Sequence, residues 1–258
     1  MKLKKIKKKQ SDIMLRQGDC LELMKDIPSK SIDMILCDLP YQRTHNKWDS
    51  LIPLQELWCH YNRIIKDNGC IALFADGLFM VDLINSNRTK WRYNLVWDKV
   101  LTSGFLNANR QPLRQHEEIV IFYKKQPTYN PQFTEGNPLH GMGSKFKNKK
   151  NKNNNYGSFN SCNNPSADRE GDTKKYPKSI LTFSRKASCS MLHPTEKSIE
   201  LCEWLIKTYT NEGDIILDNC MGSGTTGVAC KSLNRNFIGY ELDENYFNIA
   251  RDRIDNYN

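Results

Sequence analysis

The tetrapeptide Asp38-Leu39-Pro40-Tyr41 comes directly after an apolar run, residues 32–37, that predicts a buried strand. A residue that precedes proline is pushed to an extended conformation, so the Asp38 carboxylate and the Leu39 carbonyl can point in one direction. Two acceptors held together suit a substrate NH₂ group, which has two hydrogens to donate. Tyr41 offers a flat face on which an aromatic ring can stack. The alternative is an ordinary strand-ending turn, where Asp and Pro are common for local reasons.

A second candidate site is the glycine-rich turn from Asp218 to Thr226, with the sequence DNCMGSGTT, between a predicted strand and a predicted helix. Glycine lets the backbone turn sharply and approach a ligand closely, and the first turn of a helix offers unpaired N–H groups. Glu241 ends the next predicted strand, where an acid can bind both ribose hydroxyls of a nucleoside. The turn does not match GxGxxG, and no lysine follows it as in a P-loop. The turn therefore suits a ligand without phosphates. The alternative is that it only leads the chain into the helix.

The hydropathy pattern predicts the elements that position these two turns. Strands are expected at 12–17, 32–37, 70–75, 93–97, 119–123, 214–218 and 236–241, and helices at 54–66, 78–87, 195–209, 225–233 and 243–254. Gly69 is expected to cap the first of these helices. Strands that alternate with helices predict a doubly wound, mostly parallel α/β sheet. Ligands of such sheets bind beyond the carboxyl ends of the strands, where both turns would lie.

Between the two ordered parts, 12–125 and 178–258, lies an irregular stretch, 126–177, whose middle is almost entirely Lys and Asn. A segment of this length without a pattern predicts a functional or disordered insertion. The remaining part, 1–11, is a basic tail. The length of 258 residues suits one sizeable domain with such an insertion.

The net charge of +9 comes from 38 Lys and Arg against 29 Asp and Glu. Six lysines lie in residues 1–10 and five in residues 145–152, so these two runs account for the whole excess. Lysine runs of this kind are usually solvated tails or loops. They could also contact a polyanion such as DNA, because each neutralised phosphate releases counterions.

Nine cysteines without a C-x-x-C pair, an odd number, favour reduced thiols over disulfides or a zinc site. No stretch approaches 18 consecutive apolar residues, and no apolar segment follows the lysine-rich N-terminus. We therefore expect a cytoplasmic protein without a bound metal, a membrane partner or a secretory signal.

With both turns placed, the chain resembles the S-adenosylmethionine-dependent amino-methyltransferases that act on DNA. Members of this family carry a D/N/S-P-P-Y/F/W tetrapeptide and a D-x-x-x-G-S-G-T-T loop. Residues 193–198 resemble a further element of the family, HPTQKP, and residues 18–22 resemble another. The tetrapeptide precedes the cofactor loop, with an insertion between them, which is the order of the β group. The similarity covers roughly 12–125 and 178–256, and the general look is that of small phage or prophage adenine methylases.

The resemblance implies a Rossmann-like class I methyltransferase fold with a circularly permuted order of motifs. It implies that the target base flips out of double-stranded DNA, that Asp38 and the Leu39 carbonyl bind its amine, and that Tyr41 stacks on it. Asp at the first position of the tetrapeptide favours the N6 amine of adenine. The alternatives are the N4 amine of cytosine, or a catalytically weak DNA-binding protein. Leu39 replaces the proline of the family, but a carbonyl does not depend on the side chain that accompanies it.

The resemblance also implies which residues bind the cofactor S-adenosylmethionine and the DNA. The cofactor residues would be Asp19, Cys20, Thr195, Lys197, Ser198, Asp218, Gly222, Ser223, Gly224, Thr225, Thr226 and Glu241. The DNA contacts would come from Arg110, Arg114 and His116, and from Lys145, Lys147, Lys149 and Lys150 in the insertion, which would be the target-recognition region. A homodimer and a companion restriction endonuclease are further partners that the resemblance allows.

Overall fold

The computed structural model describes residues 11–41, 51–138, 171–185 and 196–257, and for 152–153 and 157–158 the strand assignment alone. The chain divides into two compact units. The first combines the chain up to Asn130 with the chain from Ser179 onward, and the second runs from Pro131 to Lys178. Each unit has its own sheet structure.

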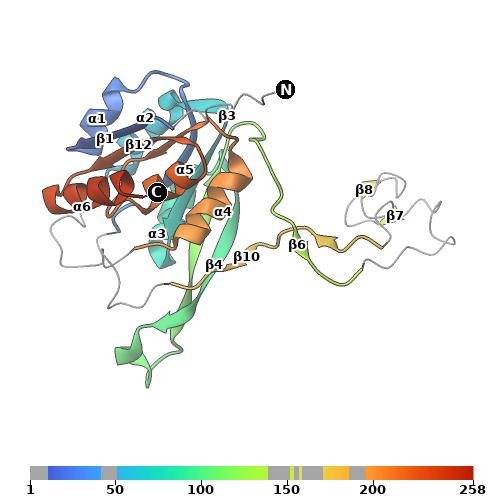
Figure 1. The fold of residues 1–258 in the computed structure, drawn as a ribbon. Coiled ribbons are helices and arrows are strands. Elements are labelled where there is room, and N and C mark those ends of the chain that lie inside the picture. The colour runs from blue at the N-terminus through green and yellow to red at the C-terminus, as the bar shows by residue number, and fades with distance from the viewer. Residues whose placement is uncertain are drawn as a thin grey trace, which may run out of the picture. The chain divides into compact units, whose positions relative to one another are not determined.

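The first unit is built on an eight-stranded sheet with the strand order β1-β12-β11-β2-β3-β5-β4-β10 (Figure 1). Its strands are β1 Ile13–Gln17, β2 Ile32–Cys37, β3 Ile65–Ala75, β4 Trp91–Ser103, β5 Arg114–Phe122, β10 Ile180–Thr182, β11 Ile215–Asp218 and β12 Asn236–Glu241. Only β5 runs antiparallel to its neighbours, β3 and β4. The predicted mostly parallel sheet is confirmed.

Helices cover both faces of this sheet. They are α1 Cys20–Leu23, α2 Leu54–Ile64, α3 Gly77–Ser86, α4 Ile199–Tyr209, α5 Thr225–Ser232 and α6 Glu244–Asp255, with 3₁₀ turns η1 Met24–Asp26 and η2 Phe105–Asn107. One core cluster packs α4, α5 and α6 against one face of the sheet, and a second cluster packs α1, α2 and α3 against the other. The fold is therefore doubly wound, as the alternation of strands and helices predicts.

The predicted boundary between α2 and β3 is wrong. The helix ends at Ile64 and the strand begins at Ile65, which pairs with Ile32 of β2. Gly69 therefore lies inside the strand rather than at a helix cap. A Cβ on Gly69 would lie 2.7 Å from the Ile65 side chain and 2.8 Å from the Asp33 carbonyl oxygen. The glycine thus allows β2 and β3 to approach closely, which is a common use of glycine within a strand.

Strands β4 and β5 are longer than the hydropathy pattern predicts, and together they form a hairpin that projects from the body of the first unit (Figure 1). Their pairing is interrupted between Asp98–His116 and Ser103–Arg114, so that four residues of β4 oppose one residue of β5. Polar and exposed side chains in this part give no alternating apolar pattern, which explains why the sequence did not reveal it.

The second unit contains two short antiparallel pairs. Strand β6 Thr134–Glu135 pairs with β9 Lys174–Lys175, and β7 Lys152–Asn153 pairs with β8 Gly157–Ser158. These pairs stand where the pattern predicted an irregular insertion. The basic tail and the side chains of Lys145, Lys147, Lys149 and Lys150 lie outside the described residues.

Within the described ranges, no helix is both long and apolar enough to cross a membrane. No group of His, Cys, Asp and Glu side chains in the same ranges could hold a metal ion. The described cysteines are free thiols.

Candidate active site

The carboxyl ends of β1, β2, β11 and β12 surround one cavity of about 430 Å³. Because β2 and β11 are adjacent, both turns that the sequence singled out reach it. The predicted site residues that line it are Asp19, Cys20, Asp38, Leu39, Pro40, Tyr41, Arg114, Lys197, Asp218, Gly222, Ser223, Thr225, Thr226 and Glu241.

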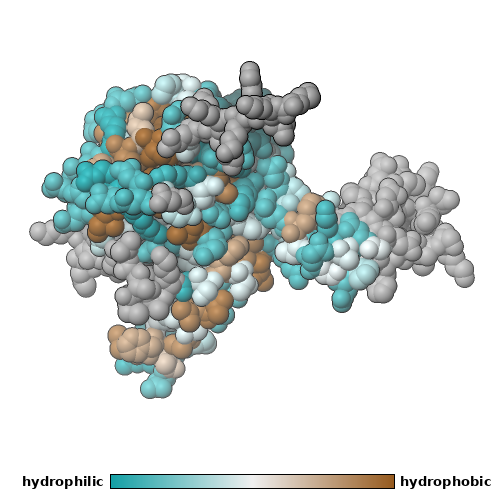
Figure 2. All heavy atoms as spheres, in the orientation of Figure 1, coloured by the Kyte–Doolittle hydropathy of each residue, from teal (hydrophilic) through white to brown (hydrophobic). Residues whose placement is uncertain are grey.

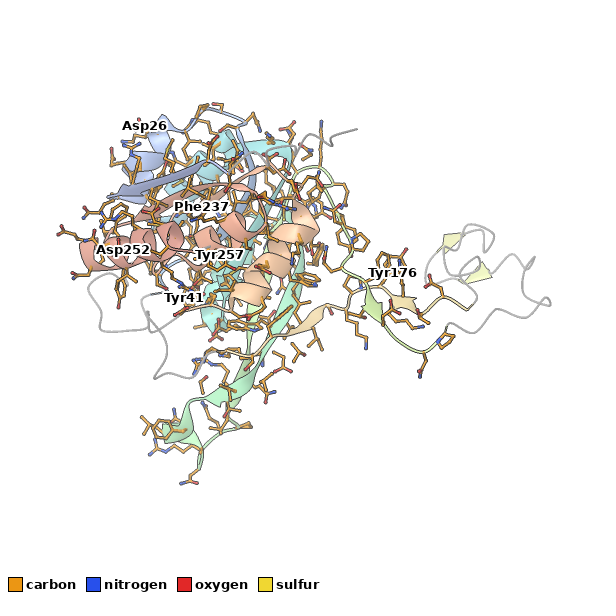
Figure 3. The ribbon with its side chains drawn as sticks, in the orientation of Figure 1. Asp26, Tyr41, Tyr176, Phe237, Asp252 and Tyr257 are labelled. Atoms are coloured by element: carbon orange, nitrogen blue, oxygen red, sulfur yellow. The ribbon has the colours of Figure 1, made fainter. Side chains whose placement is uncertain are left out.

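The tetrapeptide forms one wall of the cavity. The Tyr41 hydroxyl donates a hydrogen bond to Asp38 Oδ1. The Tyr41 ring lies 4.6 Å from the ring of Phe79 in α3, centroid to centroid (Figure 3 labels Tyr41). The Leu39 side chain is buried in the core between the sheet and helices α1, α2 and α3. Leucine can therefore replace proline here, because its side chain anchors the turn from the interior.

Lys197 lies between two carboxylates of this wall. Its Nζ is 2.9 Å from Asp38 Oδ2 and 2.9 Å from Glu117 Oε2, and Glu117 Oε1 is 3.0 Å from the Nζ of Lys99. The Lys197 side chain is only 10% exposed, and its Nζ also lies 4.9 Å from the centre of the Phe74 ring. The result is a row of alternating charges, which satisfies the requirement that buried charges be paired.

Burial and the neighbouring charges shift the pKa values of Asp38, Lys197 and Glu117. Burial raises the pKa of Asp38, and the charge of Lys197 opposes that rise. Burial alone would lower the pKa of Lys197, but Asp38 and Glu117 outweigh it and raise that pKa. Burial would raise the pKa of Glu117, yet Lys197 and Lys99 lower it to about 2. Lys197 and Glu117 are therefore charged at neutral pH.

The cofactor loop forms the opposite wall and is held by Asp218. Its Oδ2 accepts a hydrogen bond from the Thr226 hydroxyl at 2.7 Å, and its Oδ1 accepts one from the Cys220 N–H at 3.2 Å. Burial raises the pKa of Asp218 to about 7. Gly224 caps α5 with φ 79°, and a Cβ there would lie 3.0 Å from Ala250 Cβ in α6. The loop sequence thus needs glycine for its backbone conformation and for close packing.

Glu241 ends β12 beside this loop. Its Oε2 accepts a hydrogen bond from the Gly222 N–H at 2.8 Å, and its Oε1 accepts one from the Asp243 N–H at 2.9 Å. Each carboxylate oxygen keeps a further lone pair for a ligand. Asp19 caps α1 at the end of β1 by accepting from the Leu21 N–H at 2.8 Å.

The polar groups that line the cavity fit the cofactor that the motifs predict. Carboxylates at Asp19 and Glu241 suit a ligand with hydroxyl and amine donors, and the loop from Asp218 to Thr226 contains no lysine or arginine for a phosphate. A nucleoside that carries positive charge rather than phosphate meets both conditions.

Arg253 of α6 holds two residues that line the cavity, and no sequence motif revealed it. Its Nη1 donates to the carbonyl oxygen and the hydroxyl of Ser223, both at 3.1 Å, and to the Thr225 hydroxyl at 3.2 Å. Its Nη2 lies 2.8 Å from Glu196 Oε1. No local pattern singles it out, because Arg251 and Asp252 lie between the same buried residues, Ala250 and Ile254, and are exposed.

Several other predicted site residues do not line the cavity. Ser198 caps α4 by accepting from the Leu201 N–H, and neither it nor Gly224 lines the cavity. Thr195 lies outside the described residues. Arg114 forms an ion pair with Asp76 at the cavity wall. Arg110 and His116 are exposed on the β4–β5 hairpin, where His116 belongs to β5 itself rather than preceding it.

Comparison with known proteins gives one family. A family model described as DNA methylase matches residues 32–252. The Type II methyltransferase M.ScaI of Streptomyces caespitosus is 25% identical over 258 residues, which cover 95% of this chain and 82% of that protein. The Type II methyltransferase M1.MboII of Moraxella bovis is 24% identical over 250 residues, which cover 92% of this chain and 94% of that protein.

Two solved structures share the fold over nearly the whole chain. The M1.HpyAVI–SAM complex matches with a TM-score of 0.64 and 26% identity, over 94% of this chain and 98% of that one. The PvuII DNA methyltransferase, which is cytosine-N4-specific, matches with a TM-score of 0.66 and 16% identity, over 95% of this chain and 86% of that one. The second likeness concerns the fold alone.

Proposed function

Because the chain belongs to the DNA methylase family, we propose that it methylates the N6 amine of adenine at specific sites in double-stranded DNA. Family membership already makes the protein a DNA amino-methyltransferase with S-adenosylmethionine as its cofactor and a Rossmann-like class I fold. The proposal adds the base and the roles of individual residues. The choice of adenine rests on Asp38 as the first residue of the tetrapeptide. One observation carries the residue roles: the Asp38–Leu39 turn ends β2 at the wall of a cavity that the cofactor loop also lines.

The chemical problem is a poor nucleophile. The lone pair of an exocyclic amine is delocalised into the ring of the base. One N–H of the amine donates to the Asp38 carboxylate and the other to the Leu39 carbonyl, which favours a pyramidal nitrogen whose lone pair is directed away from the ring. When bound, S-adenosylmethionine supplies an electrophilic methyl group whose leaving thioether is neutral and needs no acid. The methylated nitrogen then loses one proton, which the Asp38 carboxylate accepts from the N–H that it already binds. Positioning and electrostatics therefore supply most of the catalysis.

Lys197 has a different role here from the cofactor contact that the motif implied. Its ammonium stabilises the ionised form of Asp38, because it lies 2.9 Å from Oδ2 in a largely buried site. It also fixes the carboxylate in place through its second contact with Glu117. We assign Lys197 as a positioning residue that acts through Asp38.

Tyr41 takes two positions in this scheme. Without substrate, the Tyr41 hydroxyl donates a hydrogen bond to Asp38 Oδ1, so this buried carboxylate oxygen has a partner. The amine of the entering base displaces that hydroxyl, and the Tyr41 ring then stacks on the flipped base. The amine cannot be reached inside a duplex, so flipping is a necessary step.

The cofactor residues follow from the opposite wall. Glu241 would bind the ribose hydroxyls of the cofactor, while Asp19 and Cys20 would border its adenine. The loop with Ser223, Thr225 and Thr226 holds its amino-acid end.

The test is to express the protein in a bacterial host that lacks adenine and cytosine amino-methylation. The DNA is digested to nucleosides, and mass spectrometry measures N6-methyladenine and N4-methylcytosine. We expect N6-methyladenine, which is lost in Asp38→Ala and kept in Asp26→Ala, an exposed carboxylate that pairs with Arg16. N4-methylcytosine would overturn the choice of base. Neither product, from a folded protein that binds S-adenosylmethionine, would favour the catalytically weak DNA-binding protein.

Two partners remain predictions. The relatives named as Type II methyltransferases support a companion restriction endonuclease. To test for this endonuclease, unmethylated and methylated plasmids are introduced into the source cell. A companion endonuclease would cut the unmethylated plasmid and leave the methylated one intact. Sedimentation of the purified protein tests the homodimer.

A further inference from the structure

The part of the β4–β5 hairpin beyond Asp98, residues 99–116, is called the hairpin arm below. The end of the arm nearest the sheet belongs to the active site, because Lys99, Ser103 and Arg114 line the cavity. Its tip, the turn η2, lies at the far end of the projecting hairpin (Figure 1). DNA that presents a base to the cavity must therefore pass beside the arm.

The arm begins with a bulge at Val100, where the backbone is strained. Val100 has φ 63°, which is unusual for a β-branched residue. It is held there because its N–H and the Gln115 side chain both donate to Asp98 Oδ1 at 2.9 Å. The bulge turns Lys99 inward to Glu117 and leaves Val100 and Leu101 exposed. Strain of this kind persists mainly where a function requires it.

The tip of the arm is apolar and exposed. Phe105 is 77% exposed and Leu106 is 84% exposed, and Leu113 of the same arm is also exposed. Brown and tan residues mark this tip in Figure 2. Two large apolar side chains at the end of a projecting hairpin indicate a contact surface rather than a site of internal packing.

The charge of the arm indicates what the tip contacts. Residues 99–116 contain Lys99, Arg110 and Arg114 and no acid. Among the residues that the structure describes, Lys99 and Arg114 are paired with carboxylates, while Arg110 has no ion-pair partner. An anionic partner with flat apolar surfaces satisfies both the charge and the tip, and DNA offers phosphates together with the faces of its bases.

We propose that Phe105 and Leu106 insert between base pairs next to the base that enters the cavity, while Arg110 binds a phosphate beside them. Apolar wedges of this kind unstack a base step and bend the duplex. Unstacking lowers the cost of flipping the neighbouring base. The inference rests on DNA as the substrate and holds for either target base.

The test uses the double variant Phe105→Ser, Leu106→Ser and the control Met14→Ser, a 53% exposed apolar residue on the edge strand β1. The probe is a duplex with the site that sequencing shows to be methylated, and 2-aminopurine replaces the base beside the target. We expect wild type and control to raise the fluorescence of 2-aminopurine. The double variant should not raise it and should bind the duplex about tenfold more weakly.

A second duplex, with a mismatch opposite the target base, separates a wedge from a general DNA contact. The mismatch makes flipping easier, so most of the methylation defect of the double variant should disappear on it. A separate variant, Arg110→Gln, should lower the slope of log affinity against log salt by about 0.9.

Three results would overturn the inference. The first is 2-aminopurine fluorescence that the double variant raises as much as wild type does. The second is an equal methylation defect on matched and mismatched duplexes. The third is that, in sedimentation without DNA, wild type is a dimer and the double variant a monomer. The tip would then be an interface between two copies of the chain. The duplex carries whichever base is found to be methylated, so the fluorescence readout remains decisive even if the proposed adenine specificity fails.

Discussion

The Nζ atom of Lys197 lies 2.9 Å from Asp38 Oδ2, so the acid to which we assign the substrate amine is paired with a buried lysine. The same Nζ lies 2.9 Å from Glu117 Oε2, and Glu117 in turn pairs with Lys99. The motif around Lys197 implied a cofactor contact instead. The position of Asp38 therefore depends on a charge network that extends from the segment just before α4 to Lys99 of the hairpin arm.

Lys197→Met should move the acid limb of the pH–rate profile to higher pH. Activity requires ionised Asp38, burial already raises the pKa of Asp38, and Lys197 opposes that rise. Its removal therefore leaves a larger fraction of Asp38 protonated at a given pH, and turnover at neutral pH should fall roughly tenfold or more. Stopped assays across the pH range measure this.

The control for Lys197 is Lys207→Met, which removes a partly exposed i,i+4 pair between Lys207 and Glu203 of α4. It should leave the profile unchanged, and Lys197→Arg should restore part of the activity. An acid limb at the same pH in Lys197→Met and wild type would refute the link between Lys197 and Asp38.

Glu241→Ala should weaken the binding of S-adenosylmethionine at least about tenfold, because charged hydrogen bonds contribute roughly 1.5–3 kcal/mol each. The variant also removes the acceptor for the N–H groups of Gly222 and Asp243. Calorimetry measures the affinity, and turnover at saturating cofactor should recover. Glu244→Ala, an exposed acid in the first turn of α6, is the control. Unchanged affinity in Glu241→Ala would rule out the ribose contact.

Arg253→Met should destabilise the fold by about 3–5 kcal/mol, because it breaks the buried ion pair with Glu196, whose side chain is 1% exposed. The loop would also lose its contacts with Ser223 and Thr225, so cofactor affinity should fall as well. Denaturant unfolding and calorimetry measure the two effects. Arg251→Met removes an exposed pair with Asp252 and should change neither. Equal stability of the two variants would contradict the structural role of Arg253.

The sequence predicted the sheet and both turns because strands that are buried on both faces appear as continuous apolar runs. Cys37 and Asp38 illustrate this, since the run ends where the chain reaches the cavity. The boundary at Ile64 and Ile65 was not predictable, because both residues suit the helical spacing and the strand.

Long-range polar contacts could not be derived from local patterns. Arg253 is 30 residues from Ser223 in sequence, and Lys197 is 80 from Glu117. Their pairing depends on how the helices pack on the sheet. The hairpin arm was missed for another reason: its exposed side chains carry no periodic signal, and its bulge at Val100 breaks the alternation of a strand.

The most direct test of the account is methyl transfer by Asp38→Ala to DNA from a host without amino-methylation. Radiolabelled S-adenosylmethionine reports the transfer, and calorimetry on the same protein reports cofactor affinity. We predict no incorporation above background with a cofactor affinity within about twofold of wild type, since we assign Asp38 to the base and not to the cofactor. Wild-type incorporation by Asp38→Ala would contradict the central claim that the Asp38–Leu39 turn activates the amine.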